Sequence, residues 1–207
     1  MSANSKKYIL IYANLPKRLV DLTILVTAHI AFLPIWVILW TAIPLAIWLE
    51  DHGPVFFIQK RVGINGKSFS LFKFRSMRQR RIGEEWAEAT EATDHRITKV
   101  GEILRLTALD ELPQVLNIFK GDLSIVGPRP LPMALYEEFA EASPLLRKRV
   151  QIRPGLTGLA QVYLPRNCEP QTKLESDLLY ASKMSLWLDL KLIFLSVIRT
   201  LAARWTK

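Results

Sequence analysis

Several common signatures are missing from this chain of 207 residues. Its single cysteine, Cys168, excludes an internal disulfide and any metal site built from several cysteines. A Gly-x-x-x-x-Gly-Lys-Ser/Thr loop, a His-Glu-x-x-His pair and a Gly-x-Ser-x-Gly elbow are also absent, which argues against P-loop, zinc protease and serine hydrolase functions. No internal repeat or low-complexity tract is present, so a single catalytic unit is expected.

From Leu22 to Trp48 the chain carries no Asp, Glu, Lys or Arg. This stretch is long enough for a membrane helix, and too long and too late for the core of a signal peptide. Basic residues flank it on both sides, with Lys17 and Arg18 before it and Lys60 and Arg61 after it. Because basic flanks stay in the cytoplasm, a hairpin that enters the membrane and returns is favoured over a kinked or tilted single span.

Two prolines interrupt this apolar segment. Pro34, near its middle, removes a backbone hydrogen bond and clashes with the preceding turn, so it is the predicted break of the hairpin. Pro44 is the alternative position for a kink. The predicted organisation is an N-terminal interfacial segment over residues 1–16, a re-entrant membrane helix over 17–50 and a catalytic domain over 51–207.

The C-terminal stretch from Met184 to Trp205 is apolar but interrupted by charges. Asp189, Lys191, Arg199 and Arg204 are too many charges for a comfortable membrane span. The pattern fits a helix that lies in the membrane interface, and an amphipathic helix of the protein core is the alternative.

The chain has far more basic than acidic residues, with 28 Lys plus Arg against 19 Asp plus Glu and a formal charge of +9. Such a charge predicts anionic partners. The mean hydropathy is positive at +0.15, and six tryptophans accompany the basic residues, a combination typical of a membrane interface. Phospholipids and phosphorylated substrates are therefore expected as partners, and nucleic acid is not.

Two adjacent carboxylates, Asp110 and Glu111, stand just before Pro113. A proline is tolerated only in the first turn of a helix, so a helix is predicted to begin near Asp110 and to end at Gly121, with Leu116 and Phe119 on its apolar face. Backbone N–H groups and the helix dipole would favour an ionised Asp110, which is a usable nucleophile. Ordinary helix capping explains the same two residues.

Cationic side chains that could bind phosphate surround this pair in the sequence. Prolines restrict the backbone around Arg129 and Arg153, and the planar guanidinium suits bidentate phosphate binding. Further cations lie upstream, although anionic lipid headgroups could be their partners instead: Lys73, Arg75, Arg96, Lys99 and Arg105. A carboxylate that attacks a diphosphate needs such cations and a divalent metal, for which Glu111 is the nearest candidate ligand.

The order of motifs resembles that of the small monotopic phosphoglycosyl transferases, which are bacterial sugar transferases. The resemblance runs from about Lys17 to about Thr200, and its residues are Lys17-Arg18 with Asp21, Gly53–Phe57, Gln59–Gly63, Phe72–Met77, Asp110–Gln114, Lys120–Asp122, Val126–Pro130 and Arg153–Gly158. It departs at Leu33, where many members have Ser, and in the stretch from Gln161 to Asn167.

This resemblance implies a mostly helical α+β protein of the bacterial inner membrane. A small β element and interfacial amphipathic helices would surround an active site that faces the cytoplasm. Asp110 would attack the phosphate of a UDP-sugar, UMP would leave, and the phosphosugar would pass to undecaprenyl phosphate in a ping-pong reaction. Glu111 would hold Mg²⁺, Asp177 matches a second acidic position, and Arg166 is a further substrate-binding candidate. A homodimer is compatible with the sequence.

Two other functions agree with the composition. A membrane phosphatase or pyrophosphatase acting on lipid phosphates could use the same aspartyl intermediate and pass it to water. A non-catalytic basic anchor could gather anionic partners at the membrane. Metal-dependent turnover would separate either enzyme from the anchor, and product analysis with polyprenyl phosphate would separate the two enzymes.

Overall fold

The computed structural model describes residues 15–78, 96–141, 143–165 and 167–202. Most of the predicted interfacial segment 1–16, the loop 83–94 and the substrate-binding candidate Arg166 lie outside the described residues.

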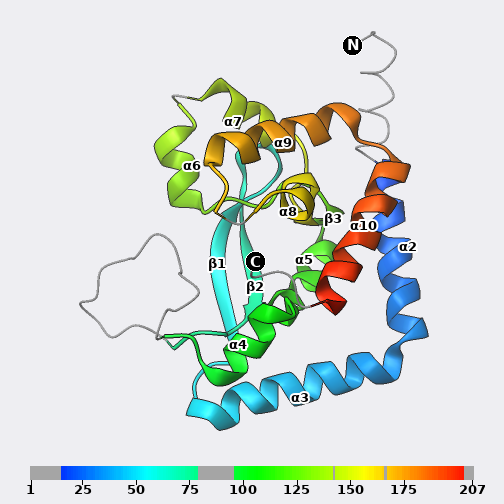
Figure 1. Ribbon diagram of the computed structural model, residues 1–207, viewed down its shortest axis with the longest axis vertical. Helices are drawn as coiled ribbons and strands as arrows, with labels where there is room; N and C mark the ends of the chain where they lie inside the picture. The colour runs from blue at the N-terminus through cyan, green and yellow to red at the C-terminus, as the bar shows by residue number, and fades with distance from the viewer. Residues whose placement is uncertain (1–14, 79–95, 142, 166, 203–207) are drawn as a thin grey trace.

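Two long helices form the N-terminal part of the described chain. Helix α2 (Leu15–Ala31) descends along one edge of the molecule, and α3 (Leu33–Asp51) runs across its base after a sharp turn (Figure 1). The helical backbone is interrupted at Phe32, where φ is −116° and ψ is 29°. The interruption therefore precedes Pro34, which occupies the first turn of α3, where its missing N–H costs nothing. Helix α3 continues through Pro44.

Aromatic side chains hold the inner side of this turn. The Trp36 indole nitrogen donates to the Ala28 carbonyl oxygen at 3.2 Å, and the His29 ring stacks on the indole with centroids 4.0 Å apart. His29 in turn bonds the Leu25 carbonyl through Nδ1 at 2.7 Å. Because the Ala28 carbonyl also accepts from the Phe32 N–H at 3.0 Å, the indole adds a second bond there and ties α3 to the last turn of α2.

Two small sheets accompany the helices. Strands β1 (Phe56–Val62) and β2 (Ser68–Phe74) pair antiparallel, with Phe56 opposite Phe74, and the short η1 (Ile64–Gly66) connects them. Strands β3 (Ser124–Val126) and β4 (Gly155–Thr157) pair parallel. The remaining elements are α4 (Lys99–Leu106), η2 (Leu109–Glu111), α5 (Gln114–Lys120), α6 (Met133–Phe139), α7 (Pro144–Arg149), α8 (Leu159–Tyr163), α9 (Pro170–Lys183) and α10 (Leu186–Leu201). The prediction of a mostly helical protein with a small β element is confirmed.

The main core joins the two ends of the described chain. Ile118, Leu123 and Leu192, from α5, the turn before β3 and α10, have no exposed surface. At the edge of this core the buried Lys17 of α2 forms an ion pair with the buried Asp189 of α10. The Tyr180 hydroxyl donates to the other Asp189 oxygen at 2.7 Å, so the carboxylate is bonded on both oxygens.

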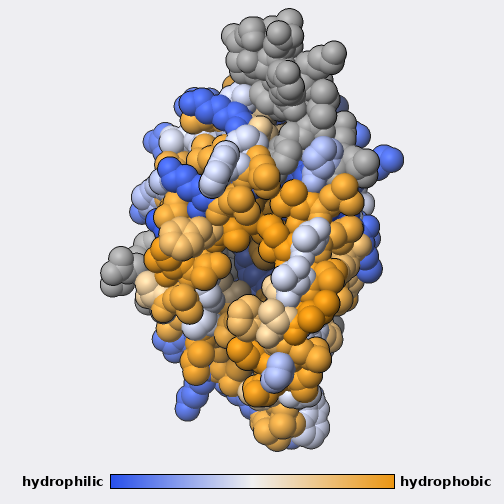
Figure 2. All heavy atoms as spheres, turned by 90° about the vertical axis from the view of Figure 1, so that its right-hand side faces the viewer, coloured by the Kyte–Doolittle hydropathy of each residue, from blue (hydrophilic) through white to orange (hydrophobic). Residues whose placement is uncertain are grey.

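A large apolar surface remains outside this core. Helix α3 is the one helix within the described ranges that is long and apolar enough to cross a membrane, and 11% of its apolar window is buried. Helix α10 turns Asp189 and Leu192 inward and exposes apolar side chains, among them Trp187 and Phe194. Figure 2 shows apolar side chains covering the face that α2 and α10 share. Apolar patches of this extent mark interaction surfaces, and this one is compatible with association with a membrane.

Candidate active site

Asp110 lies in the 3₁₀ turn η2, and the α-helix that follows begins at Gln114. The prediction that Asp110 caps this helix is therefore wrong. The turn is held by i to i+3 hydrogen bonds, such as that from the Leu112 N–H to the Leu109 carbonyl. Pro113 has no N–H, so it cannot donate the i to i+4 bond that would extend the α-helix to Leu109. The predicted end at Gly121 is confirmed, with a left-handed φ of 90°.

The apolar residues of this helix are also placed differently from the prediction. Val115 and Ile118 face the core, whereas Leu116 and Phe119 are exposed. Asn117, on the buried side, accepts from the Phe72 N–H at 3.0 Å and donates to the Ser70 carbonyl at 2.7 Å. These two bonds fix the beginning of α5, and with it Asp110 and Glu111, against β2.

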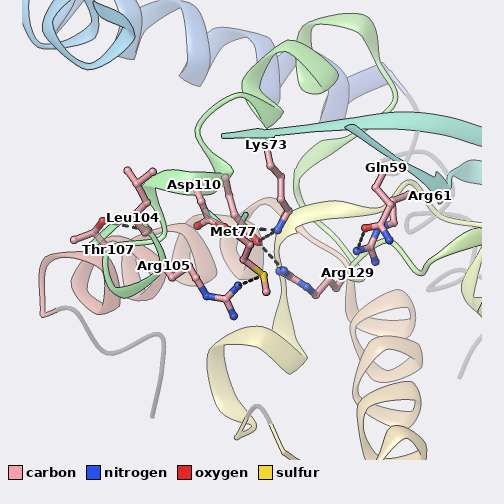
Figure 3. Close-up of polar contacts among 10 residues, drawn as sticks. Gln59, Arg61, Lys73, Met77, Leu104, Arg105, Thr107, Asp110 and Arg129 are labelled. Carbon is pink, nitrogen blue, oxygen red and sulfur yellow. Dashed lines mark hydrogen bonds and ion pairs between the residues drawn. The ribbon is translucent and has the colours of Figure 1, made fainter. Parts of the chain in front are cut away.

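Glu111 is the centre of a small charge cluster. Its Oε1 accepts from Lys73 Nζ at 2.7 Å and from Arg129 Nη2 at 2.6 Å. Lys73 Nζ is also 4.0 Å from Asp110 Oδ2. Lys73 comes from β2 and Arg129 from the loop after β3, and their side chains converge on the two carboxylates (Figure 3). Two predicted phosphate-binding residues thus lie beside the predicted nucleophile.

The pKa values of the two neighbouring carboxylates are shifted in opposite directions. Burial raises the pKa of Asp110, and the opposing charge of Lys73 does not reverse this shift. Burial alone would also raise the pKa of Glu111, but the charges of Arg129 and Lys73 and their hydrogen bonds hold it well below its usual range. Glu111 in turn raises the pKa of Arg129. The expected lowering of the Asp110 pKa by a helix terminus is not found, because Asp110 lies in η2 ahead of α5 and burial raises its pKa.

Two more arginines complete the surroundings of Asp110. The predicted Arg105 lies beside Met77, with Nη1 3.5 Å from the sulfur, and its charge acts to lower the pKa of Asp110. Arg61, which sequence reasoning missed as a site residue, donates to the Pro130 carbonyl at 3.0 Å. Burial and the charge of Arg129 lower the pKa of Arg61 to about 10.

A signal for Arg61 was present in the sequence. Gln59 and Arg61 are two positions apart on a strand, which places them on the same face, and Gln59 Oε1 accepts from Arg61 Nη2 at 2.5 Å. The Arg61 Nε is buried and has no hydrogen-bond partner among the described residues. Arg61 therefore places a second cation beside Arg129, and its Nε–H is available to an acceptor.

Arg75, by contrast, is not part of the cluster around Asp110. It is buried and forms an ion pair with Asp51 at the end of α3. Gly53 makes room for this pair, because a Cβ there would be 1.9 Å from Arg75 Nη1. Arg75 thus joins the end of α3 to β2, and its predicted role in phosphate binding has no support in this position.

Asp177 reaches the cluster only through another residue. Arg149, which sequence reasoning missed, donates from Nε to Asp177 Oδ2 at 2.7 Å and from Nη2 to the Arg129 carbonyl at 2.5 Å. Both side chains are buried, and burial raises the pKa of Asp177. The Asp177 Oδ1 atom has no hydrogen-bond partner among the described residues. The pair therefore supports the backbone that carries Arg129.

Two other predicted cations lie elsewhere. Arg153 precedes β4, and the charges that affect it are those of Arg18, Asp21 and Asp122. Arg96 lies at the edge of the undescribed segment, where its carbonyl accepts from the Arg78 N–H at 2.8 Å. Lys73, Arg105 and Arg129 thus lie near Asp110 and Glu111, whereas Arg75 and Arg153 interact with other residues.

The carboxylate pair has the donor chemistry that Mg²⁺ requires. No group of three or more His, Cys, Asp and Glu side chains that could hold a metal occurs in the part of the chain that the structure describes. However, both cations bind Glu111 through Oε1, so Oε2 forms no ion pair with any described residue. Mg²⁺ is commonly held by one or two carboxylates together with substrate phosphates and water. Glu111 and its neighbour Asp110 fit that arrangement.

Comparisons with known proteins agree with this site. The family model described as bacterial sugar transferase matches residues 12–203. The UDP-glucose:undecaprenyl-phosphate glucose-1-phosphate transferase of Caulobacter vibrioides is 39% identical over 189 residues, which are 89% of this chain and 69% of that protein.

Two further relatives differ in length. The UDP-N-acetylgalactosamine-undecaprenyl-phosphate N-acetylgalactosaminephosphotransferase of Aeromonas hydrophila is 38% identical over 179 residues, 85% of this chain but 42% of that protein. The uncharacterized sugar transferase EpsL of Bacillus subtilis is 40% identical over 155 residues, 75% of this chain and 74% of that protein. The chain thus spans less than half of the Aeromonas protein and about two thirds or more of the other two. Because the family model covers nearly all of it, the chain belongs to the bacterial sugar transferase family.

Proposed function

We propose that this protein transfers a sugar-1-phosphate from a UDP-sugar to undecaprenyl phosphate, with release of UMP. The observation that carries the proposal is the Asp110–Glu111 pair, beside which Lys73 and Arg129 form a cluster of ion pairs. The relatives from Caulobacter and Aeromonas bear names that describe this class of reaction.

The reaction proceeds in two displacements at one phosphorus atom. An ionised Asp110 oxygen attacks the phosphorus next to the sugar, the bond from this phosphorus to the UMP oxygen breaks, and an acyl phosphate that joins Asp110 to the sugar forms. An oxygen of undecaprenyl phosphate then attacks the same phosphorus and releases the Asp110 carboxylate. Burial raises the pKa of Asp110, and a carboxylate with a raised pKa is a stronger nucleophile once it is ionised.

The cations around Asp110 and Glu111 complement the negative charge of a UDP-sugar. Two phosphate groups approaching two carboxylates meet strong repulsion, which Lys73, Arg129, Arg105 and Arg61 reduce. Mg²⁺ held by Glu111 would neutralise the diphosphate further. The assignment of Asp177 as a second metal ligand stays a prediction, since Arg149 takes its Oδ2 and its Oδ1 has no partner among the described residues.

The membrane arrangement that we propose is re-entrant. Helices α2 and α3 enter the inner membrane and return, α10 lies in its interface, and the active site faces the cytoplasm. The exposure of α3 supports this arrangement, as does the contact between the Trp40 and Phe74 rings, whose centroids are 5.6 Å apart. Phe74 is next to Lys73 in β2, so the site lies close to the helix that would meet the lipid substrate.

Topology can be tested with single cysteines. In a Cys168→Ser background, cysteines at the exposed positions Pro16 and His52 would be labelled with a membrane-impermeant maleimide in inverted and right-side-out vesicles. A re-entrant helix exposes both positions on the cytoplasmic side. Labelling from opposite sides would establish a spanning helix instead.

Catalysis can be tested with the purified protein, Mg²⁺ and a panel of UDP-sugars, with and without undecaprenyl phosphate. We expect UMP release, a phosphosugar adduct on the peptide that contains Asp110 when lipid is absent, and a polyprenyl diphosphosugar when it is present. Asp110→Asn should abolish all three, whereas the exposed control Glu138→Gln should not. Normal turnover by Asp110→Asn, or full activity in EDTA, contradicts the mechanism, and transfer to water alone would identify a phosphatase.

A further inference from the structure

The last turn of α3 ends beside the first turn of α4 (Figure 1). Glu50, the second-last residue of α3, reaches two backbone amides there. Its Oε1 accepts from the Lys99 N–H at 2.7 Å, and its Oε2 accepts from the Val100 N–H at 3.1 Å. The Thr98 hydroxyl accepts from the next amide, that of Gly101, at 2.9 Å. The first three N–H groups of α4 thus each have an acceptor, and α3 supplies two of them.

This contact differs from an ordinary helix cap. A helix N-terminus normally receives its cap from a residue next to it in the chain, as Thr98 does here. Glu50 stands 49 and 50 residues before its two partners. Its carboxylate bonds both N–H groups at the positive end of the helix dipole, so the contact is directional and charge-assisted. Glu50 therefore fixes the beginning of α4 relative to α3.

Helix α4 also meets the segment that follows β2, through backbone alone. The Thr98 N–H donates to the Ser76 carbonyl at 3.2 Å, and a Cβ at Gly101 would lie 2.0 Å from the same oxygen. This close approach locates the beginning of α4 at one point. A helix attached at one point can still pivot about it. The two bonds from Glu50 add a second point of attachment, so they fix the direction of α4 as well.

The turn η2, which carries Asp110, follows α4 after only two residues. These are Thr107 and Ala108, and Ala108 has a left-handed φ of 56°, which makes the connection tight. Leu104 of α4 is buried in an apolar cluster with residues of α3 and β2, and Leu109 of η2 packs against the same cluster. A change in the direction of α4 would therefore displace η2.

The neighbouring carboxylate at the end of α3 fixes β2. Asp51 pairs with the buried Arg75, two residues after Lys73. Lys73 Nζ lies 4.0 Å from Asp110 Oδ2, and this distance depends on how β2 and η2 are placed relative to each other. Adjacent residues of α3 thus hold the two segments that carry the pair, because Asp51 holds the end of β2 and Glu50 holds α4.

We infer that Glu50 is a positioning residue for the transfer reaction, and that through α4 it holds Asp110 beside Lys73 for attack on the donor phosphate. The inference rests on the proposed function and adds a residue to it. Glu50 bonds the backbone of α4, so it acts through that helix and not on the substrate itself. Its loss should slow the chemical step more than it weakens donor binding. Reacting atoms require closer alignment than binding does, and a displacement of about 1 Å can cost about 100-fold in rate.

Single-turnover kinetics can separate this role from a loss of stability. Formation of the phosphosugar adduct would be followed in detergent, at a saturating concentration of the UDP-sugar that wild type cleaves fastest. The variants are Glu50→Ala, Glu50→Gln and two controls. Glu102→Gln removes the same charge from an exposed position in the first turn of α4. Ser185→Ala removes the side-chain cap of α10, which accepts from the Leu188 N–H.

The rate and the affinity should respond differently. We expect adduct formation to be slower by about tenfold or more in Glu50→Ala, and by less in Glu50→Gln, which keeps one acceptor. Both controls should match wild type. The dissociation constant of the UDP-sugar, measured in an Asp110→Asn background, should change by less than about twofold. Thermal unfolding verifies that the variants are folded, and Glu50→Gln decides the comparison if Glu50→Ala is not.

Hydrogen exchange gives a second readout that needs no turnover. The Glu111 and Leu112 N–H groups donate the hydrogen bonds of η2, both at 3.1 Å. These amides should exchange about fivefold faster in Glu50→Gln and at the wild-type rate in both controls. Equal adduct rates in the Glu50 variants and Glu102→Gln overturn the positioning role, as does a loss of affinity equal to the loss of rate, or faster exchange confined to the beginning of α4. Absence of the adduct in wild type refutes the proposed function instead, and exchange in η2 then decides whether Glu50 holds the turn.

Discussion

Arg129 Nη2 lies 2.6 Å from Glu111 Oε1, and this bond links the loop after β3 to the carboxylate pair. The Arg129 side chain is 49% exposed, whereas that of Glu111 is 14% exposed. The arginine therefore has donors left for a substrate phosphate while it holds Glu111 ionised.

Replacement of Arg129 should slow donor cleavage strongly. Arg129→Gln loses a charge-assisted bond to Glu111 and one phosphate cation, for which we expect a decrease of about 10- to 100-fold in kcat/KM for UMP release. Arg129→Lys should recover only a small part, since an ammonium cannot bind bidentately. Arg147→Gln, on the exposed side of α7, is the control, and equal rates for Arg129→Gln and wild type contradict this role.

The pH dependence of UMP release should depend on Lys73. Asp110 attacks only when ionised, and burial raises its pKa above the ordinary 3.8, so the rate should fall as the pH decreases through that raised value. Lys73 lowers the pKa of Asp110, and Lys73→Met should therefore move the acidic limb to higher pH. Profiles of kcat/KM against pH for wild type, Lys73→Met and the exposed Lys60→Met would show this. An acidic limb in Lys73→Met that stays in place or moves to lower pH contradicts the assignment.

Loss of Arg149 should destabilise the protein. Arg149→Gln leaves the buried Asp177 carboxylate without its ion-pair partner, which typically costs about 3–5 kcal/mol of unfolding free energy. The double variant Arg149→Gln/Asp177→Asn removes the unpaired charge and should recover part of the loss. Denaturant unfolding in detergent would measure both, with the exposed Arg147→Gln as control. If the double variant is as unstable as the sum of both single variants, the pair is not coupled.

The turn between α2 and α3 should depend on Trp36. Trp36→Phe keeps a ring to stack on His29 but removes the N–H that binds the Ala28 carbonyl, and we expect a loss of about 1 kcal/mol in unfolding free energy. Trp187→Phe is the matched control, because Trp187 is 82% exposed on α10. Equal stabilities of the two variants would show that the indole bond contributes nothing.

Much of the fold was predictable because it depends on local sequence. The long apolar segment, the break close to Pro34, the predominance of helices and the helix end at Gly121 each follow from residues near one another in the chain. The helix start at Asp110 was wrong because Pro113 permits a 3₁₀ turn before the helix as well as a first helical turn.

The site was predictable only in part, because the sequence does not distinguish an arginine that could bind substrate from one that forms a structural ion pair. Arg75 and Arg129 both stand within motifs of the resemblance, yet Arg75 pairs with Asp51 inside the protein and Arg129 pairs with Glu111. Arg149 carries no local signal, since its partner Asp177 is 28 residues away and the pairing depends on how α7 and α9 pack. Arg61 joins the cluster because the chain brings β1 beside the loop at Pro130.

The buried pair of Lys17 and Asp189 joins residues 172 positions apart. Because α10 is synthesised long after α2, Lys17 has no Asp189 partner until the chain has been made as far as α10. The packing of α2 on α10 is therefore completed only after the residues between them, including Asp110 and Glu111, have been synthesised. A nascent chain that stops before Leu186 contains α2 and α3 but lacks the Asp189 carboxylate that pairs with Lys17.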